Sequence, residues 1–210
     1  VNSKLKSLGY EDLEQLETDL KALPFLDKIY KSVDLKNIGR LQGTSGAIEV
    51  AKNICEIANS NGIETIEGYF DDTVTGDILK TKGNVDLITG FNVFAHSDNL
   101  KEITNNTFKL LKDDGTFVVE VQYLLDTIKD LTFDNIYHEH VNYWSVISLN
   151  NFFDNLGYKL YKVEHVDTHG GSIRAYVGTQ NKTVDSSVDK FIKKELEFGL
   201  DKFETYKEFG

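Results

Sequence analysis

The segment 135–144, NIYHEHVNYW, gathers side chains that can move protons. It holds two of the five histidines of the chain, two tyrosines and the single tryptophan, with a glutamate between the histidines. The unperturbed pKa of histidine lies closest to neutrality, so histidines in a loop beside a pocket are candidates for general acid–base catalysis. Four of the five fall in predicted loops, and all lie in one stretch of the chain: His96, His138, His140, His165 and His169.

The His-x-His spacing of this segment allows two other interpretations. The two histidines could bind a metal ion, but alternate residues point the same way only on an extended strand. The sequence offers no further cysteine or Asp/His cluster to complete a ligand set, so we predict no metal site. The remaining interpretation is a structural loop whose histidines cap helices.

A second dense motif is THGGSIR, residues 168–174. Glycines without side chains let a backbone approach a ligand closely. His169 and Arg174 could therefore face an anion at this place. The alternative is a tight turn into an edge strand, with Arg174 exposed.

The elements that must position these residues alternate along the middle of the chain. Apolar runs predict strands, and segments with helical spacing of apolar residues predict helices. The predicted strands are 47–50, 63–70, 85–94 and 116–124, and the predicted helices are 51–62 and 99–115. This alternation predicts an α/β fold with a parallel, doubly wound sheet.

The second half of the chain has a different pattern. A helix over 145–157, with Ser148 as its N-cap, precedes two adjacent predicted strands, 158–167 and 172–180. Two such strands at the end of an α/β sheet predict an antiparallel edge hairpin. A charged helix is predicted over 184–206. We therefore divide the chain into a helical segment 1–36, a core 37–180 and a C-terminal helical segment 181–210.

Ligands of open parallel sheets bind outside the carboxyl ends of the strands. Glu49 follows the first of these strands, Tyr69 and Phe70 the second, and Asn92 the third. A carboxylate at the position of Glu49 can accept two hydrogen bonds from the cis-diol of a ribose. The alternative is a solvated surface carboxylate.

Composition limits the classes of partner. The net charge of −11 disfavours general attraction to nucleic acid. The single cysteine, Cys55, excludes a disulfide within the chain and is expected to be a buried thiol on a helix. The sequence contains no membrane-span or signal-peptide pattern, so a cytoplasmic protein without a membrane partner is expected. Composition does not indicate an oligomeric state.

Taken together, these motifs resemble a family: the S-adenosylmethionine-dependent C-methyltransferases that methylate C-3 of nucleotide-linked keto-deoxysugars. The resemblance covers residues 45–206 in unbroken order, that is, the central and early C-terminal portion of the family's pattern. It is carried by GIETIEGYF, NVFAH, FVVEVQYLLD, FDNIYHEHVNYWS, THGGSIRAYV and KKELEFGLDKFETY. It implies a class I methyltransferase fold, which is Rossmann-like and whose last two strands form an antiparallel hairpin.

The resemblance also implies roles for residues. The family's active-site positions are matched by His96, Tyr137, Glu139 and His140. We assign His140 as base, Glu139 as its orienter or as a ligand for a sugar hydroxyl, and Tyr137 or His96 as donors to an enolate oxygen. The positions that bind S-adenosylmethionine are Glu49, Tyr69, Phe70 and Asn92. We assign His138, Tyr143, His169 and Arg174 to the binding of a nucleotide-sugar substrate.

The chain departs from the family's pattern in three places. The family begins with a cysteine-rich zinc-binding lobe and ends with a further α/β domain, and this sequence has neither. The family's first strand and glycine-rich loop, V-x-E-I-G-x-x-D-G, should precede Glu49, where this chain has SVDLKNIGRLQGTSG. We therefore expect a missing or altered first strand, and a fragment of a longer polypeptide.

These departures keep other functions open. One is a non-catalytic methyltransferase-like module that binds a nucleotide-sugar or a partner. Another is an O- or N-methyltransferase for a different small molecule, because the fold permits it. A third is a histidine-based metallohydrolase.

Overall fold

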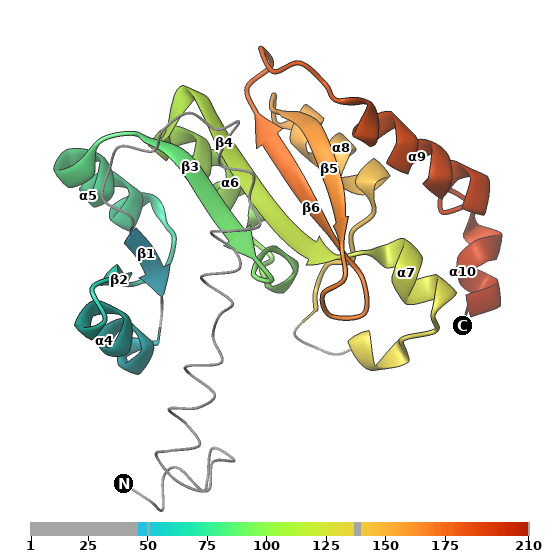
Figure 1. Ribbon diagram of the computed structural model, residues 1–210, viewed down its shortest axis with the longest axis horizontal. Helices are drawn as coiled ribbons and strands as arrows, with labels where there is room; N and C mark the ends of the chain where they lie inside the picture. The colour runs from blue at the N-terminus through green and yellow to red at the C-terminus, as the bar shows by residue number, and fades with distance from the viewer. Residues whose placement is uncertain (1–45, 50, 137–139, 210) are drawn as a thin grey trace, which may run out of the picture. The chain divides into compact units, whose positions relative to one another are not determined.

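The computed structural model describes residues 46–49, 51–136 and 140–209 (Figure 1). Residues 45–210 form one compact unit. The predicted helical segment 1–36 and nearly all of the glycine-rich segment that precedes Glu49 lie outside the described residues. The described elements are β1 (Gly46–Glu49), α4 (Lys52–Ser60), β2 (Glu64–Glu67), α5 (Asp72–Lys82), β3 (Val85–Phe91), the 3-10 helix η1 (Phe94–His96), α6 (Leu100–Leu110), β4 (Leu111–Gln122), α7 (Leu124–Lys129), the 3-10 helix η2 (Phe133–Asn135), α8 (Val146–Asn155), β5 (Lys159–Val166), β6 (Ser172–Gly178), α9 (Ser186–Phe198) and α10 (Phe203–Phe209).

The strands form two sheets within the described residues. Strands β1 and β2 pair in parallel, and the four-stranded sheet has the order β3-β4-β6-β5. Strand β3 is parallel to β4, whereas β6 is antiparallel to both of its neighbours. The predicted antiparallel hairpin is confirmed, but its last strand lies inside the sheet and β5 forms the edge. All seven residues of β6 are buried, as expected of an interior strand, while most residues of β5 are only partly buried and one is exposed.

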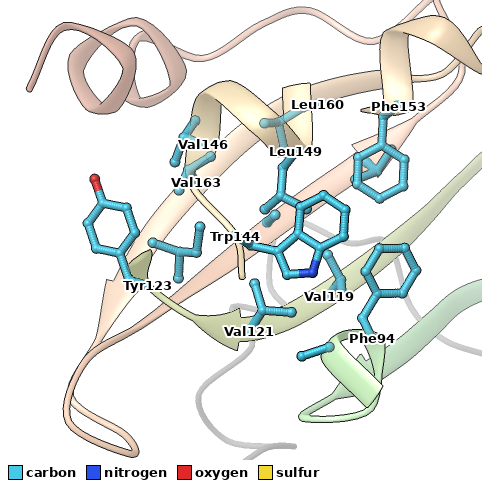
Figure 2. Close-up of a cluster of buried hydrophobic side chains, with 14 of the residues drawn as sticks. Phe94, Val119, Val121, Tyr123, Trp144, Val146, Leu149, Phe153, Leu160 and Val163 are labelled. Carbon is cyan, nitrogen blue, oxygen red and sulfur yellow. The ribbon is translucent and has the colours of Figure 1, made fainter. Parts of the chain in front are cut away.

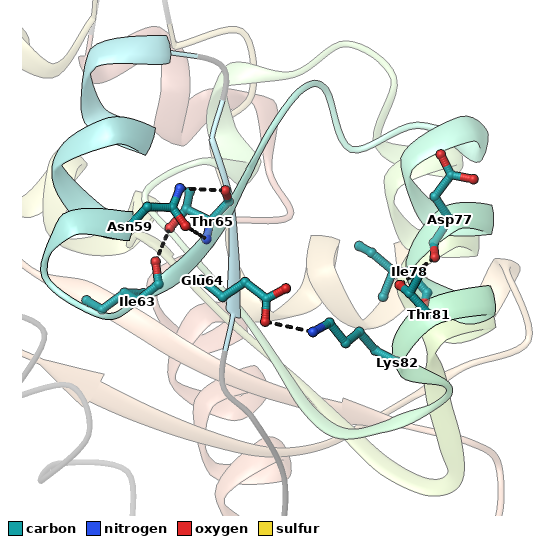
Figure 3. Close-up of polar contacts among 8 residues, drawn as sticks. All are labelled: Asn59, Ile63, Glu64, Thr65, Asp77, Ile78, Thr81 and Lys82. Atoms are coloured by element: carbon teal, nitrogen blue, oxygen red, sulfur yellow. Dashed lines mark hydrogen bonds and ion pairs between the residues drawn. The ribbon is translucent and has the colours of Figure 1, made fainter.

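Side-chain hydrogen bonds hold the β1–β2 part together (Figure 3). Asn59 at the end of α4 donates to the carbonyl oxygen of Thr65 at 2.9 Å and accepts from its N–H at 3.0 Å. Lys82 pairs with Glu64 at 2.8 Å and so links α5 to β2. Helix α5 was not predicted, because its threonines, valine and glycine are poor helix formers. Its start depends on Asp71, whose side chain accepts from the N–H groups of residues 73 and 74.

One face of the four-stranded sheet carries the main hydrophobic core (Figure 2). Phe94 packs against three other rings of this core, with ring centroids 5.7 Å from Trp144, 5.9 Å from Phe153 and 6.0 Å from Phe117. Phe94 lies two residues before His96, and Trp144 lies four residues after His140. The contact between these two buried rings therefore brings together the two histidine-bearing segments.

Helix α8 begins one turn earlier than the sequence indicated. The prediction of Ser148 as N-cap is wrong: Ser145 is the N-cap, and Ser148 is the third helical residue of a capping box. The Ser148 N–H donates to Ser145 Oγ at 3.1 Å, and the Ser145 N–H donates to Ser148 Oγ at 2.9 Å. Either serine satisfies the sequence rule for an N-cap, and the reciprocal bonds select the first one.

The predicted helix over 184–206 is two helices. Gly199 ends α9 with φ 89°, a left-handed conformation that glycine adopts without steric cost, and α10 begins at Phe203. Helix α9 packs on β5 and α8.

A carboxylate from α9 accepts hydrogen bonds from backbone N–H groups in the first turn of α8. Glu195 is fully buried and accepts from the N–H groups of Val146 at 2.6 Å and Ile147 at 2.9 Å. Burial raises the pKa of the Glu195 carboxyl above its ordinary value of 4.5, although the two N–H groups oppose this effect. A raised pKa means that the folded protein binds this proton more tightly than the unfolded chain does.

Glu195 should therefore make stability depend on pH. We expect its protonation to favour folding fully below about pH 4.5, and this contribution to be lost as pH rises through the folded-state pKa. Urea unfolding of wild type and Glu195→Gln, from below pH 4.5 to neutral pH, measures this contribution to the free energy of unfolding, since glutamine does not titrate. Glu197→Gln, on the exposed part of α9, is the matched control for loss of one carboxylate. If the free energy of unfolding varied with pH in the same way for wild type and Glu195→Gln, the expectation would be contradicted.

Candidate active site

Two histidines from distant parts of the sequence meet at the carboxyl ends of β3 and β4. The ring centroids of His96 and His140 lie 4.8 Å apart. The N–H groups of Val141 and Asn142 both donate to the carbonyl oxygen of Ala95, at 3.1 and 3.2 Å. The Asn142 side chain also donates to the carbonyl oxygen of Ser97 at 2.8 Å. These bonds on both sides of His96 fix the two imidazoles beside each other.

One hydrogen bond of His140 favours a particular tautomer of its neutral ring. Its Nδ1 lies 2.9 Å from the carbonyl oxygen of Asn135. A carbonyl oxygen can only accept, so Nδ1 of the neutral ring carries the hydrogen and the lone pair is on Nε2. The hydroxyl of Tyr143 donates to the same carbonyl oxygen at 3.3 Å. The loop thus presents His140 as a base through Nε2.

A pocket of about 230 Å³ lies beside these histidines. Among the described residues its lining consists of Asn92, Ala95, His96, Val121, Gln122, Asn135, His140 and His169. Four predicted site residues are therefore brought together: His96, His140, Asn92 and His169. The strand-end rule that selected Asn92 also points to Gln122 at the end of β4, although no role was assigned to it. Asn135 was not predicted as a site residue.

Two pocket residues hold unusual backbone conformations. Asn92 has φ 54° and His169 has φ 50°, in the left-handed region that residues other than glycine seldom adopt. The Asn92 N–H donates to the carbonyl oxygen of Glu120 at 3.0 Å, which fixes the turn after β3. Such conformations cost free energy and cluster at functional sites.

A buried ion pair lies on the two strands next to this pocket. Arg174 of β6 donates to Glu120 Oε2 of β4 from Nε at 3.0 Å and from Nη2 at 2.7 Å. Thr168 donates to the other oxygen of Glu120 at 3.1 Å, which ties the turn that carries His169 to the pair. The alternative of an exposed Arg174 on an edge strand is wrong, since Arg174 is 6% exposed on an interior strand. Arg174 is not among the described residues that line the pocket.

The predicted cofactor residues lie at the ends of the first two strands. Glu49 ends β1 and is half-buried, and its Oε1 accepts from the Ala51 N–H at 2.9 Å. Tyr69 and Phe70 follow β2, and Tyr69 is 75% exposed. None of these three lines the pocket at the histidines. The predicted site residues Tyr137, His138 and Glu139 lie outside the described residues.

Neither a metal-ligand cluster nor a membrane-spanning helix is found in the part of the chain that the structure describes. Across residues 46–49, 51–136 and 140–209, no group of three His, Cys, Asp or Glu side chains is arranged to hold a metal ion. No helix in the same ranges combines the length and apolar character that crossing a bilayer requires.

Gly171 shows how closely the turn beside His169 is packed. Its φ is 111°, and a Cβ added there would lie 2.9 Å from Cβ of Asp126 and overlap its Oδ2. We expect Gly171→Ala to lower the free energy of unfolding by roughly 2–4 kcal/mol, as strain and overpacking add. Urea denaturation measures this loss.

Gly62→Ala is the matched control, since Gly62 has φ 81° with no atom within 4 Å of the added Cβ. It should show the backbone strain alone, about 1 kcal/mol. Equal losses for the two variants would mean that the Asp126 contact contributes nothing.

Comparison with known proteins defines the class to which this fold and site belong. A family model described as "Methyltransferase domain" matches residues 32–163, and one described as "C-methyltransferase C-terminal domain" matches residues 167–210. The chain therefore belongs to the S-adenosylmethionine-dependent methyltransferases.

A curated relative narrows the resemblance to C-methyltransferases. The chain is 35% identical over 165 residues to C-methyltransferase NovU of Streptomyces niveus, which is 78% of this chain and 39% of NovU. The similarity to C-methyltransferases noted from the motifs is thus confirmed. The chain spans about two fifths of the length of this relative.

Solved structures agree on the fold. Magnesium protoporphyrin IX methyltransferase (ChlM) of Synechocystis PCC 6803, solved with bound S-adenosylhomocysteine, has a TM-score of 0.53 and 8% identity over 80% of this chain and 88% of its own. LepI in complex with S-adenosylmethionine has a TM-score of 0.50 and 11% identity over 72% of this chain and 39% of its own. The predicted class I methyltransferase fold is confirmed.

Proposed function

We propose that this chain is the methyltransferase portion of a C-methyltransferase that acts on a nucleotide-linked keto-deoxysugar. The observation that carries the proposal is the pair of imidazoles of His96 and His140, 4.8 Å apart in one pocket at the carboxyl ends of parallel strands. The similarity to NovU supports carbon as the atom methylated. A cytoplasmic location stays a prediction from the sequence.

Methylation of a carbon next to a ketone requires removal of a weakly acidic C–H proton. In this proposal His140 takes that proton on Nε2, since its Nδ1 carries the hydrogen donated to Asn135. His96, adjacent to it, and Tyr137 donate hydrogen bonds to the enolate oxygen as negative charge develops there. Glu139 orients His140 or binds a sugar hydroxyl. General base catalysis contributes typically 10²–10⁴-fold.

The described residues fit the ribose and adenine parts of the cofactor. The Glu49 carboxylate lies at the carboxyl end of a parallel strand, where acids accept hydrogen bonds from ribose hydroxyls. Tyr69 and Phe70 provide aromatic surface at the end of β2, and Asn92 lies at the end of β3. When bound, S-adenosylmethionine supplies an electrophilic methyl group on a sulfonium, and no metal is required. Alignment of such reactants contributes about 7–11 kcal/mol to lowering the barrier.

The substrate side of the site is assigned to uncharged polar groups and histidines. Asn92, Gln122 and His169 line the pocket with amide and imidazole groups suited to sugar hydroxyls. His138 and Tyr143 belong to the same sequence segment as His140, residues 135–144. Arg174 is paired with Glu120, so we expect its contribution to substrate binding to act through the turn at Thr168.

Incubation of the 210-residue chain with S-adenosylmethionine and a nucleotide-linked keto-deoxysugar tests the proposal. Mass spectrometry of the product should locate a new methyl group on carbon. A methyl group on oxygen or nitrogen would assign the chain to another class of methyltransferase. Calorimetry with S-adenosylmethionine alone separates the non-catalytic alternative, for which no binding of the cofactor is expected.

A further inference from the structure

Asn135 makes two side-chain hydrogen bonds that the catalytic proposal does not use. Its Oδ1 accepts from Gln122 Nε2 at 2.9 Å, and its Nδ2 donates to Thr132 Oγ1 at 3.0 Å. Gln122 ends β4 of the four-stranded sheet, so the side-chain amide of Asn135 is bonded to a rigid element. The Asn135 N–H also donates to the carbonyl oxygen of Thr132 at 3.1 Å within η2. Both the side chain and the backbone of Asn135 are thereby fixed.

The carbonyl oxygen of this fixed residue is the acceptor for His140 Nδ1, at 2.9 Å. The direction of this carbonyl therefore favours the tautomer of His140 that carries its hydrogen on Nδ1. If that carbonyl turned away, the neutral ring could place its hydrogen on Nε2. It would then present an N–H group where the reaction needs a lone pair.

We propose that Asn135 is a positioning residue: its side chain, held between Gln122 and Thr132, aims its own carbonyl at His140 and keeps the basic lone pair on Nε2. The inference deepens the proposed function, on which its kinetic consequence rests. Asn135 need not touch substrate to act in this way. Its effect passes through His140.

The first test reads the tautomer directly and needs no turnover. ¹⁵N NMR of the histidine-labelled, 210-residue chain at alkaline pH distinguishes a protonated Nδ1 from a protonated Nε2, with His140 assigned by comparison with His140→Asn. We expect Nδ1–H in wild type and a mixture or the opposite tautomer in Asn135→Ala. Asn135→Asp should restore Nδ1–H, because it keeps the acceptor for Gln122 and can accept from the Thr132 hydroxyl.

The second test measures methyl transfer. Asn135→Ala should lower kcat about tenfold or more and change KM by a smaller factor, because the altered tautomer of His140 acts on the proton-transfer step and the lost amide is one of several groups that line the pocket. Thr132→Val, which removes only the hydrogen bond from Asn135 Nδ2 and lies outside the described pocket lining, should lower kcat less. Asn84→Ala is the matched control. Asn84 donates to the carbonyl oxygen of Lys109 at 3.0 Å at the other end of β3, so its loss should leave kcat unchanged.

The outcomes separate the inference from the proposed function. A wild-type His140 with its hydrogen on Nε2 overturns the inference, as does an Asn135→Ala variant that keeps both the wild-type tautomer and kcat. A variant with an altered tautomer and an unchanged kcat supports the positioning role and overturns His140 as the base. A fall in kcat with an unchanged tautomer also overturns the inference, because Asn135 would then act by another route.

Discussion

Replacement of His140 by asparagine should lower kcat for methyl transfer by about 10²–10⁴-fold and leave the affinity for S-adenosylmethionine unchanged. Asparagine can still donate a hydrogen bond to the carbonyl oxygen of Asn135, so the loop should keep its shape. It has no basic nitrogen to accept the substrate proton. Initial rates at saturating nucleotide-linked keto-sugar give kcat, and calorimetry gives the cofactor affinity.

His165→Asn is the matched control for the loss of an imidazole. His165 lies on β5, where its Nε2 contacts Asp126 Oδ2 at 2.5 Å, and it does not line the pocket. We expect this variant to keep the wild-type kcat. A His140→Asn enzyme that retained the wild-type rate at saturating substrate would show that His140 is not the base.

Replacement of Glu120 by glutamine should destabilise the fold by about 3–5 kcal/mol, which is the usual cost of removing one partner from a buried ion pair. Glu120 is 2% exposed and accepts two hydrogen bonds from Arg174 and one from Thr168. The variant leaves the buried guanidinium without that carboxylate. The melting temperature should fall by roughly 10 °C, as measured by calorimetry or circular dichroism.

Asp77→Asn provides the comparison at the surface. The Asp77–Lys80 pair has side chains that are 67% and 77% exposed, and such pairs contribute about 0–1 kcal/mol.

In the double variant Glu120→Gln/Arg174→Met much of the lost stability should return, because neither charge of the buried pair remains. A loss below about 1 kcal/mol for Glu120→Gln would show that the pair is not important for stability.

The sequence by itself determined the elements whose pattern is local. Apolar runs and helical spacing located β1, β3, β4, α4 and α6, although residues 111–115, predicted as the end of a helix, are the start of β4. The rule that ligands bind at strand ends selected Asn92. Helix α5 was not predicted, because its weak helix formers give no clear helical spacing of apolar residues. Its N-cap at Asp71 was also not recognised. Ser145 and Ser148 show the same limit, since both satisfy the local capping rule.

Only the tertiary structure decided which distant residues are neighbours. The insertion of β6 between β4 and β5 places Arg174 opposite Glu120, 54 positions earlier in the chain, and so buries a residue that looked exposed on an edge strand. The carbonyl oxygen of Ala95 brings His140 beside His96, and the carbonyl oxygen of Asn135 selects its basic nitrogen. Periodicity reports the environment of a residue along one element. Strand order and the direction of a carbonyl depend on contacts between elements, and no period in the sequence records them.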